Sequence, residues 1–365
     1  MIYRVIGLMS GSSLDGLDIA FIEFEEKGGK WQFAIQETDC VPYKVELETR
    51  IKNSIHLTAR EYVSLHSEYG HFLGKAVNKF IETKNLQYKV ALIASHGHTT
   101  FHVPGSFSAQ LGDGAAIAAE TGLPVVSDLR AMDVALGGQG APIVPVGEKL
   151  LFEGHAYFLN IGGIANISYH GNEIHRAFDI CPANRILNML SQQVEKTYDE
   201  NGTMAAAGRI HGELLDQLNA LSYYKGQYPK SLSNEFGTDI VYPLIKSFSI
   251  SIPDALATYV EHIAIQTSEA IQLINKAENI LAAENSIMVT GGGAFNEYLV
   301  SRISFHLAVH SINVVVPEKS IVAFKEAIIM ALLGVLRWRE EETVLSTITG
   351  ASRNSIGGAL WMGGN

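Results

Sequence analysis

Glycine-rich turns supply the residue types in this sequence that are best suited to binding phosphate. The segment "GSSLDGLD" at residues 11–18 joins two apolar runs and contains small hydroxyl side chains and two aspartates. Such a turn can point successive backbone N–H groups at an anion, because glycine permits close approach and a positive φ. Asp15 and Asp18 are equally compatible with ordinary turn chemistry, in which a carboxylate bonds to its own backbone. Both interpretations stay open for this segment alone.

Two further segments extend the pattern. Residues 156–169, "AYFLNIGGIANISY", again consist of two apolar runs joined by a glycine-containing turn. This repetition predicts two related halves, and two such hairpins facing across a cleft could hold a polyphosphate from both sides. The segment "VTGGGAFN" at 289–296 precedes a helical pattern. Gly291–Gly293 could let a base or a ribose lie against the backbone, or could simply form a strand-to-helix turn with Asn296 near the helix start.

The elements expected around these turns alternate between strands and helices. Thr58 and Glu61 form a capping-box pattern ahead of an apolar helical stripe at residues 62–81. Asp254 is expected to cap a second helix, with a stripe at residues 256–274. Short apolar runs bounded by Gly or polar residues predict strands at 2–8, 17–24, 90–94, 157–161, 164–169 and 286–290. Strands and helices in both halves predict an α/β fold.

The composition excludes several classes of partner. The chain has 365 residues, of which 47% are hydrophobic, and this suffices for about two domains. Its formal net charge of −11 would repel nucleic acid and anionic membrane surfaces. The apolar stretch at 327–336 is too short to cross a bilayer, and residues 1–20 lack the pattern of a secretory signal. Cys40 and Cys181 form no disulfide or zinc pattern, so we expect a protein of the reducing cytosol.

Common nucleotide and hydrolase motifs are absent from the sequence. It contains no GxxxxGK[ST] phosphate loop, no GxGxxG opening a helix near the N-terminus, no HExxH and no GxSxG. If the protein has a nucleotide site, that site must therefore be of the facing-hairpin type.

Several segments together resemble the anhydro-N-acetylmuramic acid kinase family. They are "GLMSGSSLDGLDIA", "SHGHTTFH", "LGDGAAIAAETGLPVVSDLRAMDVALGGQGAPIVP", "NIGGIANIS", "FDICPANRILN", "PKSLSNEFG" and "VTGGGAFN". The resemblance extends from Gly7 to about Gly358 and implies an α/β fold of two related actin-like (ribonuclease H-like) domains with a nucleotide cleft between them. The implied N-terminal domain comprises residues 1–128 together with 355–365, and the C-terminal domain comprises 129–354.

The resemblance also implies a reaction. The family is implied to use ATP and Mg²⁺, to open the 1,6-anhydro bond of anhydro-N-acetylmuramic acid with water, and to phosphorylate O6 in the recycling of cell-wall peptidoglycan. This chemistry needs a base that activates water and a clamp for the phosphates. The implied protein is a cytoplasmic homodimer. The alternatives are an ATP-dependent kinase of another sugar or anhydro-sugar, and an actin-like or chaperone-like conformational ATPase.

Roles for nucleotide-binding and catalytic residues follow from the same resemblance. The implied ATP-binding positions are Gly11, Ser12, Ser13, Leu14, Asp15, Gly16, Leu17, Asp18, Gly163, Asn166, Gly291, Gly292, Gly293 and Asn296. Asp15 is expected to orient hydrated Mg²⁺, and Ser12 replaces the usual threonine. Asp179 is the implied general base, with a helix N-cap as the alternative. Ile180 and Cys181 stand where relatives usually have Thr and Gly.

The sugar-binding residues implied by the resemblance carry charge or amide groups. Arg130 and Asp133 match positions beside the sugar, and the planar fork of arginine suits the lactyl carboxylate; the alternative is a surface ion pair of Arg130 with Asp128 or Asp133. Glu326 is also expected to face the sugar, unless it only complements a helix dipole from the first turn. The remaining positions are Asn184, which equally suits a first helical turn, and His98, where the family often has Gln. His96 and His98 lack the third ligand that a metal site would need.

Overall fold

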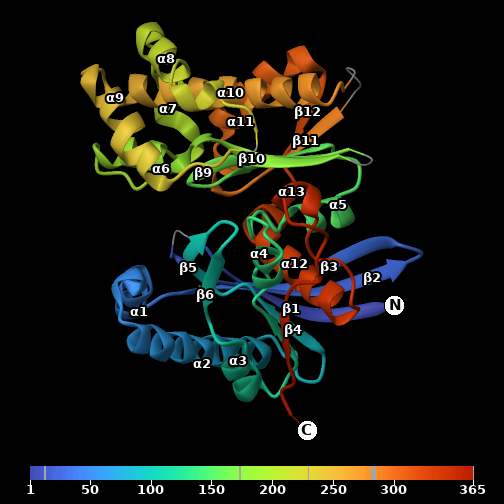
Figure 1. Cartoon of the computed structure of the whole chain (residues 1–365). Coiled ribbons are helices and arrows are strands. Elements are labelled where there is room, and N and C mark those ends of the chain that lie inside the picture. Colours follow the sequence, from blue (N-terminus) through green and yellow to red (C-terminus); the bar gives the residue numbers. More distant parts are fainter. Residues whose placement is uncertain (12–13, 172–173, 229, 281–284, 365) are drawn as a thin grey trace. The chain divides into compact units, whose positions relative to one another are not determined.

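The protein divides into two compact units (Figure 1). The computed structural model describes residues 1–11, 14–171, 174–228, 230–280 and 285–364. Unit 1 comprises Met1–Glu153 and Phe324–Asn365, and unit 2 comprises Gly154–Ala323. The domain bounds expected from the sequence, after residues 128 and 354, differ from these and stay a prediction. Residues 128–153 belong to unit 1 because they bond within it, for example from Gln139 N to Thr349 O.

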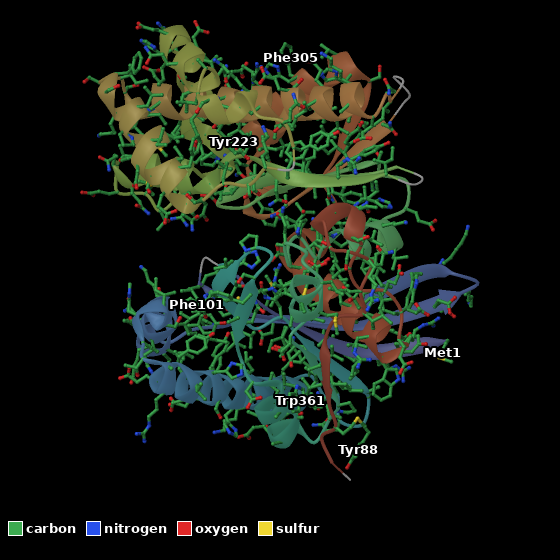
Figure 2. The ribbon with its side chains drawn as sticks, in the orientation of Figure 1. Met1, Tyr88, Phe101, Tyr223, Phe305 and Trp361 are labelled. Atoms are coloured by element: carbon green, nitrogen blue, oxygen red, sulfur yellow. The ribbon has the colours of Figure 1, made fainter. Side chains whose placement is uncertain are left out.

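Unit 1 is built on a six-stranded sheet with the order β13-β7-β4-β1-β2-β3. Its strands are β1 (Ile2–Ser10), β2 (Gly16–Lys27), β3 (Lys30–Pro42), β4 (Leu92–Ser95), β7 (Val125–Ser127) and β13 (Ala359–Trp361). β2 runs antiparallel to β1 and β3, whereas β1, β4 and β7 run parallel. The C-terminal strand β13 completes the edge, where Trp361 (Figure 2) donates from Nε1 to Ser127 Oγ at 3.0 Å.

Unit 2 repeats this topology in a five-stranded sheet with the order β10-β9-β8-β11-β12. Its strands are β8 (Tyr157–Ile161), β9 (Ile164–His170), β10 (His175–Pro182), β11 (Asn285–Thr290) and β12 (Ile312–Val315). Again the second strand is antiparallel to its neighbours, and the first, fourth and fifth strands are parallel. This is the core strand arrangement of the ribonuclease H-like fold. The prediction of an α/β fold with two related halves is therefore confirmed.

Helices pack against the sheet of each unit. In unit 1 these are α1 (Val45–Lys52), α2 (Ala59–Thr83), α3 (Gly114–Thr121), α4 (Ala131–Ala135), α5 (Pro145–Leu151) and α13 (Ser346–Thr349), together with most of α12 (Lys319–Trp338). A separate two-stranded sheet pairs β5 (His98–Val103) with β6 (Phe107–Leu111). The apolar face of α2, including Leu65, Tyr69 and Leu73, packs into the core with Ile6 and Leu8 of β1.

Unit 2 is the more helical of the two. Its α-helices are α6 (Asn184–Gln192), α7 (Thr203–Ala207), α8 (Gly212–Asn219), α9 (Tyr242–Ser247), α10 (Ile252–Ala277) and α11 (Glu297–Leu307). Shorter helical turns in the chain are η1 (Ser54–His56), η2 (Glu200–Gly202), η3 (Ser222–Lys225), η4 (Phe236–Val241), η5 (Gly292–Phe295) and η6 (Ala308–His310). The long helix α10 packs on β10 and contacts α7, α8 and α11 (Figure 1). Among the helices of the described residues, none has the length and apolar content needed to cross a bilayer.

The N-termini of α2 and α10 show which of the two predicted helix caps are correct. Thr58 and Glu61 form the predicted capping box of α2, with Thr58 Oγ1 accepting from Glu61 N and Glu61 Oε2 accepting from Thr58 N. The predicted cap at Asp254 is wrong, because Ser251 is the N-cap of α10 and its hydroxyl accepts from Asp254 N. Asp254 instead accepts a hydrogen bond from Arg209 N at 2.7 Å. All six predicted strands are present, with ends shifted by at most a few residues.

Close packing of β1 on α12 predicts a large loss of stability for Gly7→Ala. A Cβ on Gly7 would overlap the carbonyl oxygen of Ala327 in the helix backbone, which cannot rotate away as a side chain can. We expect the free energy of unfolding to fall by about 3 kcal/mol. Urea denaturation measures this value. Gly212→Ala is the matched control, because Gly212 has open space around it, and an equal loss in both variants would contradict the packing argument.

Candidate functional site

The β1–β2 turn of unit 1 carries the first group of predicted ATP-binding residues. Of these, Ser12 and Ser13 lie outside the described residues. Leu14 has a φ of 55°, and its N–H donates to Gly11 O at 3.3 Å. A Cβ on Gly16 would come within 2.8 Å of Cys40 Sγ and Val41 O, and this close approach requires glycine. Leu14 and Leu17 are buried in the core of unit 1, so their side chains anchor the turn.

The two aspartates of this turn have different environments. Asp15 is exposed, whereas Asp18 is half-buried in β2 and pairs in register with Cys40 of β3. Burial raises the pKa of Asp18 to about 6; the Cys40 thiol opposes the rise by donating a hydrogen bond, and the charge of Asp15 adds to it. Mg²⁺ keeps several waters and takes one or two carboxylates. An exposed Asp15 beside Asp18 fits a hydrated Mg²⁺ ion.

The raised pKa of Asp18 predicts that affinity for ATP in the presence of Mg²⁺ falls below pH about 6. Protonation at low pH removes a negative charge next to the predicted Mg²⁺ position, whereas the carboxylate is ionised at pH 7 to 8. Calorimetric titration from pH 5 to 8 measures the change. Because ATP itself titrates in this range, the comparison is with Asp18→Asn, which should show a weaker pH dependence. Equal pH dependence in both proteins would contradict the role of Asp18.

His96 fixes the side chain of Arg130 in unit 1. Arg130 is half-buried; its Nε donates to His96 Nε2 at 3.0 Å and its Nη1 to Gly140 O at 2.6 Å. Gly97 O accepts only, so the ring proton of His96 lies on Nδ1, 2.9 Å from that oxygen. Burial, with the charge of Arg130, lowers the pKa of His96 to about 3, which keeps the ring neutral. The alternative of a surface ion pair for Arg130 therefore does not hold.

Asp133 holds the loop that follows Arg130. Its Oδ2 accepts from Gly140 N and its Oδ1 from the Thr349 hydroxyl, each at 2.7 Å, and the side chain is buried. Both oxygens are therefore engaged within unit 1. Asp133 holds Gly140 in place, and the Gly140 carbonyl accepts a hydrogen bond from Arg130. Asp133 therefore acts on the predicted sugar site through Arg130 and not by direct contact.

Glu326 lies beside a buried ion pair. It is half-buried in α12, well past the first turn, so the helix-dipole alternative is wrong. Burial raises the pKa of Glu326, and the charges of Lys325 and Arg130 oppose that rise. Lys325 Nζ itself lies 2.8 Å from Glu148 Oε1, with both side chains buried. A carboxylate held near Arg130 in this way can accept a hydrogen bond from a sugar hydroxyl.

His98 joins a chain of buried hydroxyl groups. Its Nδ1 lies 3.2 Å from Ser10 Oγ, Tyr43 donates to Ser10 Oγ at 2.8 Å, and the Tyr43 and Tyr69 hydroxyls are 2.6 Å apart. Burial lowers the pKa of His98, so the ring is neutral near pH 7. With Nδ1 bonded to Ser10, the Nε2 nitrogen of the neutral ring can bond a polar ligand. Among the described residues, no group of three His, Cys, Asp or Glu side chains could hold a metal ion.

A row of polar side chains crosses the sheet of unit 2. Asn160 of β8 pairs with Asn166 of β9, and Asn166 pairs with Asp179 of β10. Directly opposed residues of antiparallel strands project from the same face, so the three side chains lie side by side. All three are half-buried. Asp179 lies inside β10 and the N-cap of α6 is Ala183, so the helix-cap alternative for Asp179 is wrong.

One oxygen of the Asp179 carboxylate is held by the backbone. Leu232 N donates to Asp179 Oδ2 at 2.9 Å, and Asp179 N donates to Lys230 O at 3.1 Å. The Tyr223 hydroxyl (Figure 2) donates to Asp179 O at 2.6 Å. Burial raises the pKa of Asp179, and the bond from Leu232 opposes the rise. Within the described residues Oδ1 accepts no hydrogen bond, so this oxygen remains for a proton.

Glycine segments meet at one end of the same sheet. β8 and β11 are parallel, so the β8–β9 turn and Gly291–Gly293 follow neighbouring strand ends. Gly291 has a φ of 80°, and a Cβ on it would lie 2.7 Å from Asn160 Oδ1; a Cβ on Gly293 would overlap the Ile161 side chain. Gly163 has open space on its Cα. The structure thus brings Gly163, Asn166 and Gly291–Gly293 to one region of unit 2.

The other predicted residues of this region have structural partners. Asn184 is the first residue of α6, and its Nδ2 donates to Ile161 O at 2.9 Å, which secures the end of β8. Asn296 caps α11, where its Oδ1 accepts from Leu299 N at 3.0 Å. Arg185, next to Asn184, has a buried Nε with no hydrogen-bond partner among the described residues. Its backbone N–H donates to Gly163 O at 3.4 Å, and a buried donor without a protein partner can bond an anionic ligand.

Sequence reasoning missed the residues that orient the predicted ones. The sequence assigns no role to His96, and no motif in it assigns one to Asn160, Tyr223 or Leu232. The segment "PKSLSNEFG" was the available signal for Leu232, since it matched the family without an assigned function.

Two units of ribonuclease H-like topology in one chain define the class of actin-like proteins, which includes sugar kinases. The chain belongs to the anhydro-N-acetylmuramic acid kinase family, whose model matches residues 3–363. It is 32% identical to the anhydro-N-acetylmuramic acid kinase of a Sulfurovum species over 98% of this chain and 99% of that protein. It is 34% identical to the kinase of the same name from Francisella tularensis subsp. novicida, over 97% of each chain.

A solved structure matches over most of the chain at lower similarity. Component A of (R)-2-hydroxyglutaryl-CoA dehydratase from Acidaminococcus fermentans covers 91% of this chain and 97% of its own, with 14% identity and a TM-score of 0.47. This likeness is too distant to bear on function.

Proposed function

We propose that this chain is an ATP-dependent kinase that opens the 1,6-anhydro bond of anhydro-N-acetylmuramic acid with water and phosphorylates the freed O6. Family membership supports the kinase and its sugar. The observation that carries the mechanism is the carboxylate of Asp179, which is held on Oδ2 by Leu232 N and has Oδ1 available. This geometry suits a general base.

Asp179 would act on the water that attacks C1 of the sugar. The water oxygen forms a bond to C1, its proton passes to Asp179 Oδ1, and the bond from C1 to O6 breaks. The electron pair of that bond stays on O6, which takes the γ-phosphoryl group of ATP. The products are ADP and N-acetylmuramic acid 6-phosphate. Burial keeps the pKa of Asp179 above its ordinary value, which makes the carboxylate a stronger base.

The glycine segments and the β1–β2 turn would hold ATP. Their backbone N–H groups would bond phosphate oxygens, and Gly163 has open space on its Cα for such an approach. Arg185, whose backbone N–H donates to Gly163 O, would add a charged donor through its Nε. Asp15 and Asp18 are the residues that would hold hydrated Mg²⁺, which neutralises phosphate charge during transfer. The expectation that nucleotide binds between the two halves stays a prediction.

The remaining charged residues of unit 1 would hold the sugar. Arg130 has a fixed guanidinium because His96 and Gly140 occupy Nε and Nη1. Its remaining N–H groups can bond the lactyl carboxylate of the sugar. Glu326 and His98 would accept from or donate to the sugar hydroxyl and acetamido groups. Asn184 would help shape the sugar site by securing Ile161 at the end of β8.

Product analysis with purified protein tests this function. We expect ATP and anhydro-N-acetylmuramic acid to give ADP and N-acetylmuramic acid 6-phosphate in equal amounts, identified by mass spectrometry. ATP turnover without any sugar would support a conformational ATPase, and turnover with another anhydro-sugar alone would support a different substrate.

The cellular setting and the assembly are further parts of this proposal. A protein of the cytoplasm with two unpaired cysteines, Cys40 and Cys181, is compatible with the sequence. A homodimer is implied by the family resemblance. Sedimentation equilibrium of the full chain decides between a monomer and a dimer.

A further inference from the structure

Unit 2 contains a pocket of about 380 Å³ between β10, α10 and the segment that follows η3. Pockets that bind small molecules span roughly 300–1,000 Å³, so this one has the size for a single small metabolite. Phe178 of β10 and Leu273 of α10 form part of its apolar wall. None of the residues assigned above to ATP, Mg²⁺ or the sugar lines it.

The pocket has positive charge in a strongly acidic protein. Lys225, Lys230 and Lys276 line it, and Glu269 is the one acidic residue among its described lining residues. Neither Lys225 nor Lys276 forms an ion pair with a carboxylate within the described part of the chain. The formal net charge of the chain is −11. Lysines gathered in a concave site focus positive potential there, which favours an anion locally despite the net negative charge of the protein.

Amide side chains add a second kind of recognition. Gln227, Gln266 and Gln272 line the same pocket, and each amide can both donate to and accept from a hydroxyl group. The ring of Tyr224 lies beside them and offers an apolar edge. Ammonium groups for a phosphate, amides for hydroxyls and aromatic surface for C–H groups together match a phosphorylated monosaccharide.

The pocket lies behind the proposed base. Successive residues of a strand project from opposite faces, so Phe178 faces the pocket while Asp179 faces the row of polar side chains. Lys230 lines the pocket with its side chain and contacts Asp179 with its backbone. Its Nζ lies 4.7 Å from the centroid of the Tyr223 ring, and its carbonyl oxygen accepts the hydrogen bond from Asp179 N. Two residues further on, Leu232 N holds Asp179 Oδ2.

We propose that this pocket binds a small sugar phosphate, and that the contact of its phosphate with Lys230 lowers turnover at Asp179. The phosphate draws the Lys230 ammonium from the Tyr223 ring into the pocket. The backbone of residues 230–232 then shifts, and the hydrogen bond from Leu232 to Asp179 weakens. The effect on turnover rests on the proposed function, whereas binding in the pocket does not.

Glucose 6-phosphate, glucose and inorganic phosphate are suitable probes. Calorimetry measures their affinity, and hydrogen–deuterium exchange locates the contact. We expect glucose 6-phosphate to protect the peptides that contain residues 223–228 and 266–276, and to bind more tightly than glucose or phosphate. The variant Lys225→Gln/Lys276→Gln should bind it at least tenfold more weakly. The matched control Lys196→Gln/Lys246→Gln removes the same charge from exposed positions of unit 2 and should bind it as the natural protein does.

The kinase assay supplies the second readout. Saturating glucose 6-phosphate should lower kcat severalfold in the natural protein and have little effect on Lys225→Gln/Lys276→Gln, whose kcat without the ligand should be unchanged. Absence of binding, or equal binding by both lysine variants, would overturn the proposed site even if the kinase is active. Protection only outside the pocket would also overturn it. If binding occurs and kcat is unaffected, the effect on Asp179 is wrong.

Discussion

Asp179→Asn is expected to lower kcat by about 10²- to 10⁴-fold, the usual contribution of a general base. The amide cannot take the proton of the attacking water, yet it has nearly the same size and its oxygen can still accept from Leu232 N. ATP affinity should therefore stay within about twofold of the natural value. Steady-state kinetics with anhydro-N-acetylmuramic acid, together with calorimetric titration of ATP, measures both quantities.

Two comparisons make this result specific to Asp179. Asp216→Asn changes an exposed carboxylate of α8 in the same unit and should leave kcat unchanged. The pH profile of kcat/KM should fall toward low pH, as Asp179 takes up a proton at a pKa above its ordinary value. An Asp179→Asn protein that retains a tenth or more of the natural kcat would remove this residue from the role of base.

Arg130→Gln is expected to raise KM for anhydro-N-acetylmuramic acid by about 10- to 100-fold, because hydrogen bonds to a charged group contribute roughly 1.5–3 kcal/mol. The loss should be specific to the lactyl carboxylate. With 1,6-anhydro-N-acetylglucosamine, which lacks the lactyl group, the natural protein and the variant should have similar KM values. Arg130→Lys should be intermediate, because its ammonium keeps the charge and loses the planar fork.

A second result would contradict this account of Arg130. If Arg130→Gln raises KM equally for both sugars, the side chain acts by holding the loop to Gly140 and His96 rather than by binding the carboxylate. Thermal unfolding of the variant provides the necessary control for folding. An unchanged Tm together with a carboxylate-specific KM effect supports direct binding.

Local patterns in the sequence predicted most of the sheet framework. Apolar runs between turn residues located β1, β2, β4, β8, β9 and β11, and the repeated hairpin predicted two related halves, which the shared strand order confirms. The capping box at Thr58 also follows from neighbouring residues. At Asp254 the same reasoning was wrong because Ser251, three residues earlier, caps the helix from a position equally typical of a cap.

The contacts that shape the candidate site join residues that are distant in the chain. The hydrogen bond from Leu232 N to Asp179 spans 53 residues. Its donor is a backbone N–H, which every residue except proline has, so the type of side chain at position 232 does not predict it. The Asn160–Asn166 pair follows from the short β8–β9 turn, whereas Asp179 joins the row only through the register of β10 on β9, which shifts just after Asp179. His96 follows β4 and Arg130 follows β7, so the two side chains meet only because these strands are neighbours in the sheet. Such positioning follows from tertiary structure alone.

The central claim is that water enters the sugar and not the phosphate, and heavy-oxygen water tests it directly. The reaction is run in H₂¹⁸O with ATP and anhydro-N-acetylmuramic acid, and the products are analysed by mass spectrometry. Because C1 of the open sugar slowly exchanges oxygen with water, the label is read at early times against N-acetylmuramic acid 6-phosphate kept in the same water. The account predicts one ¹⁸O at C1 in each newly formed product and none in its phosphate. Label in free phosphate, with the anhydro sugar unchanged, would contradict it.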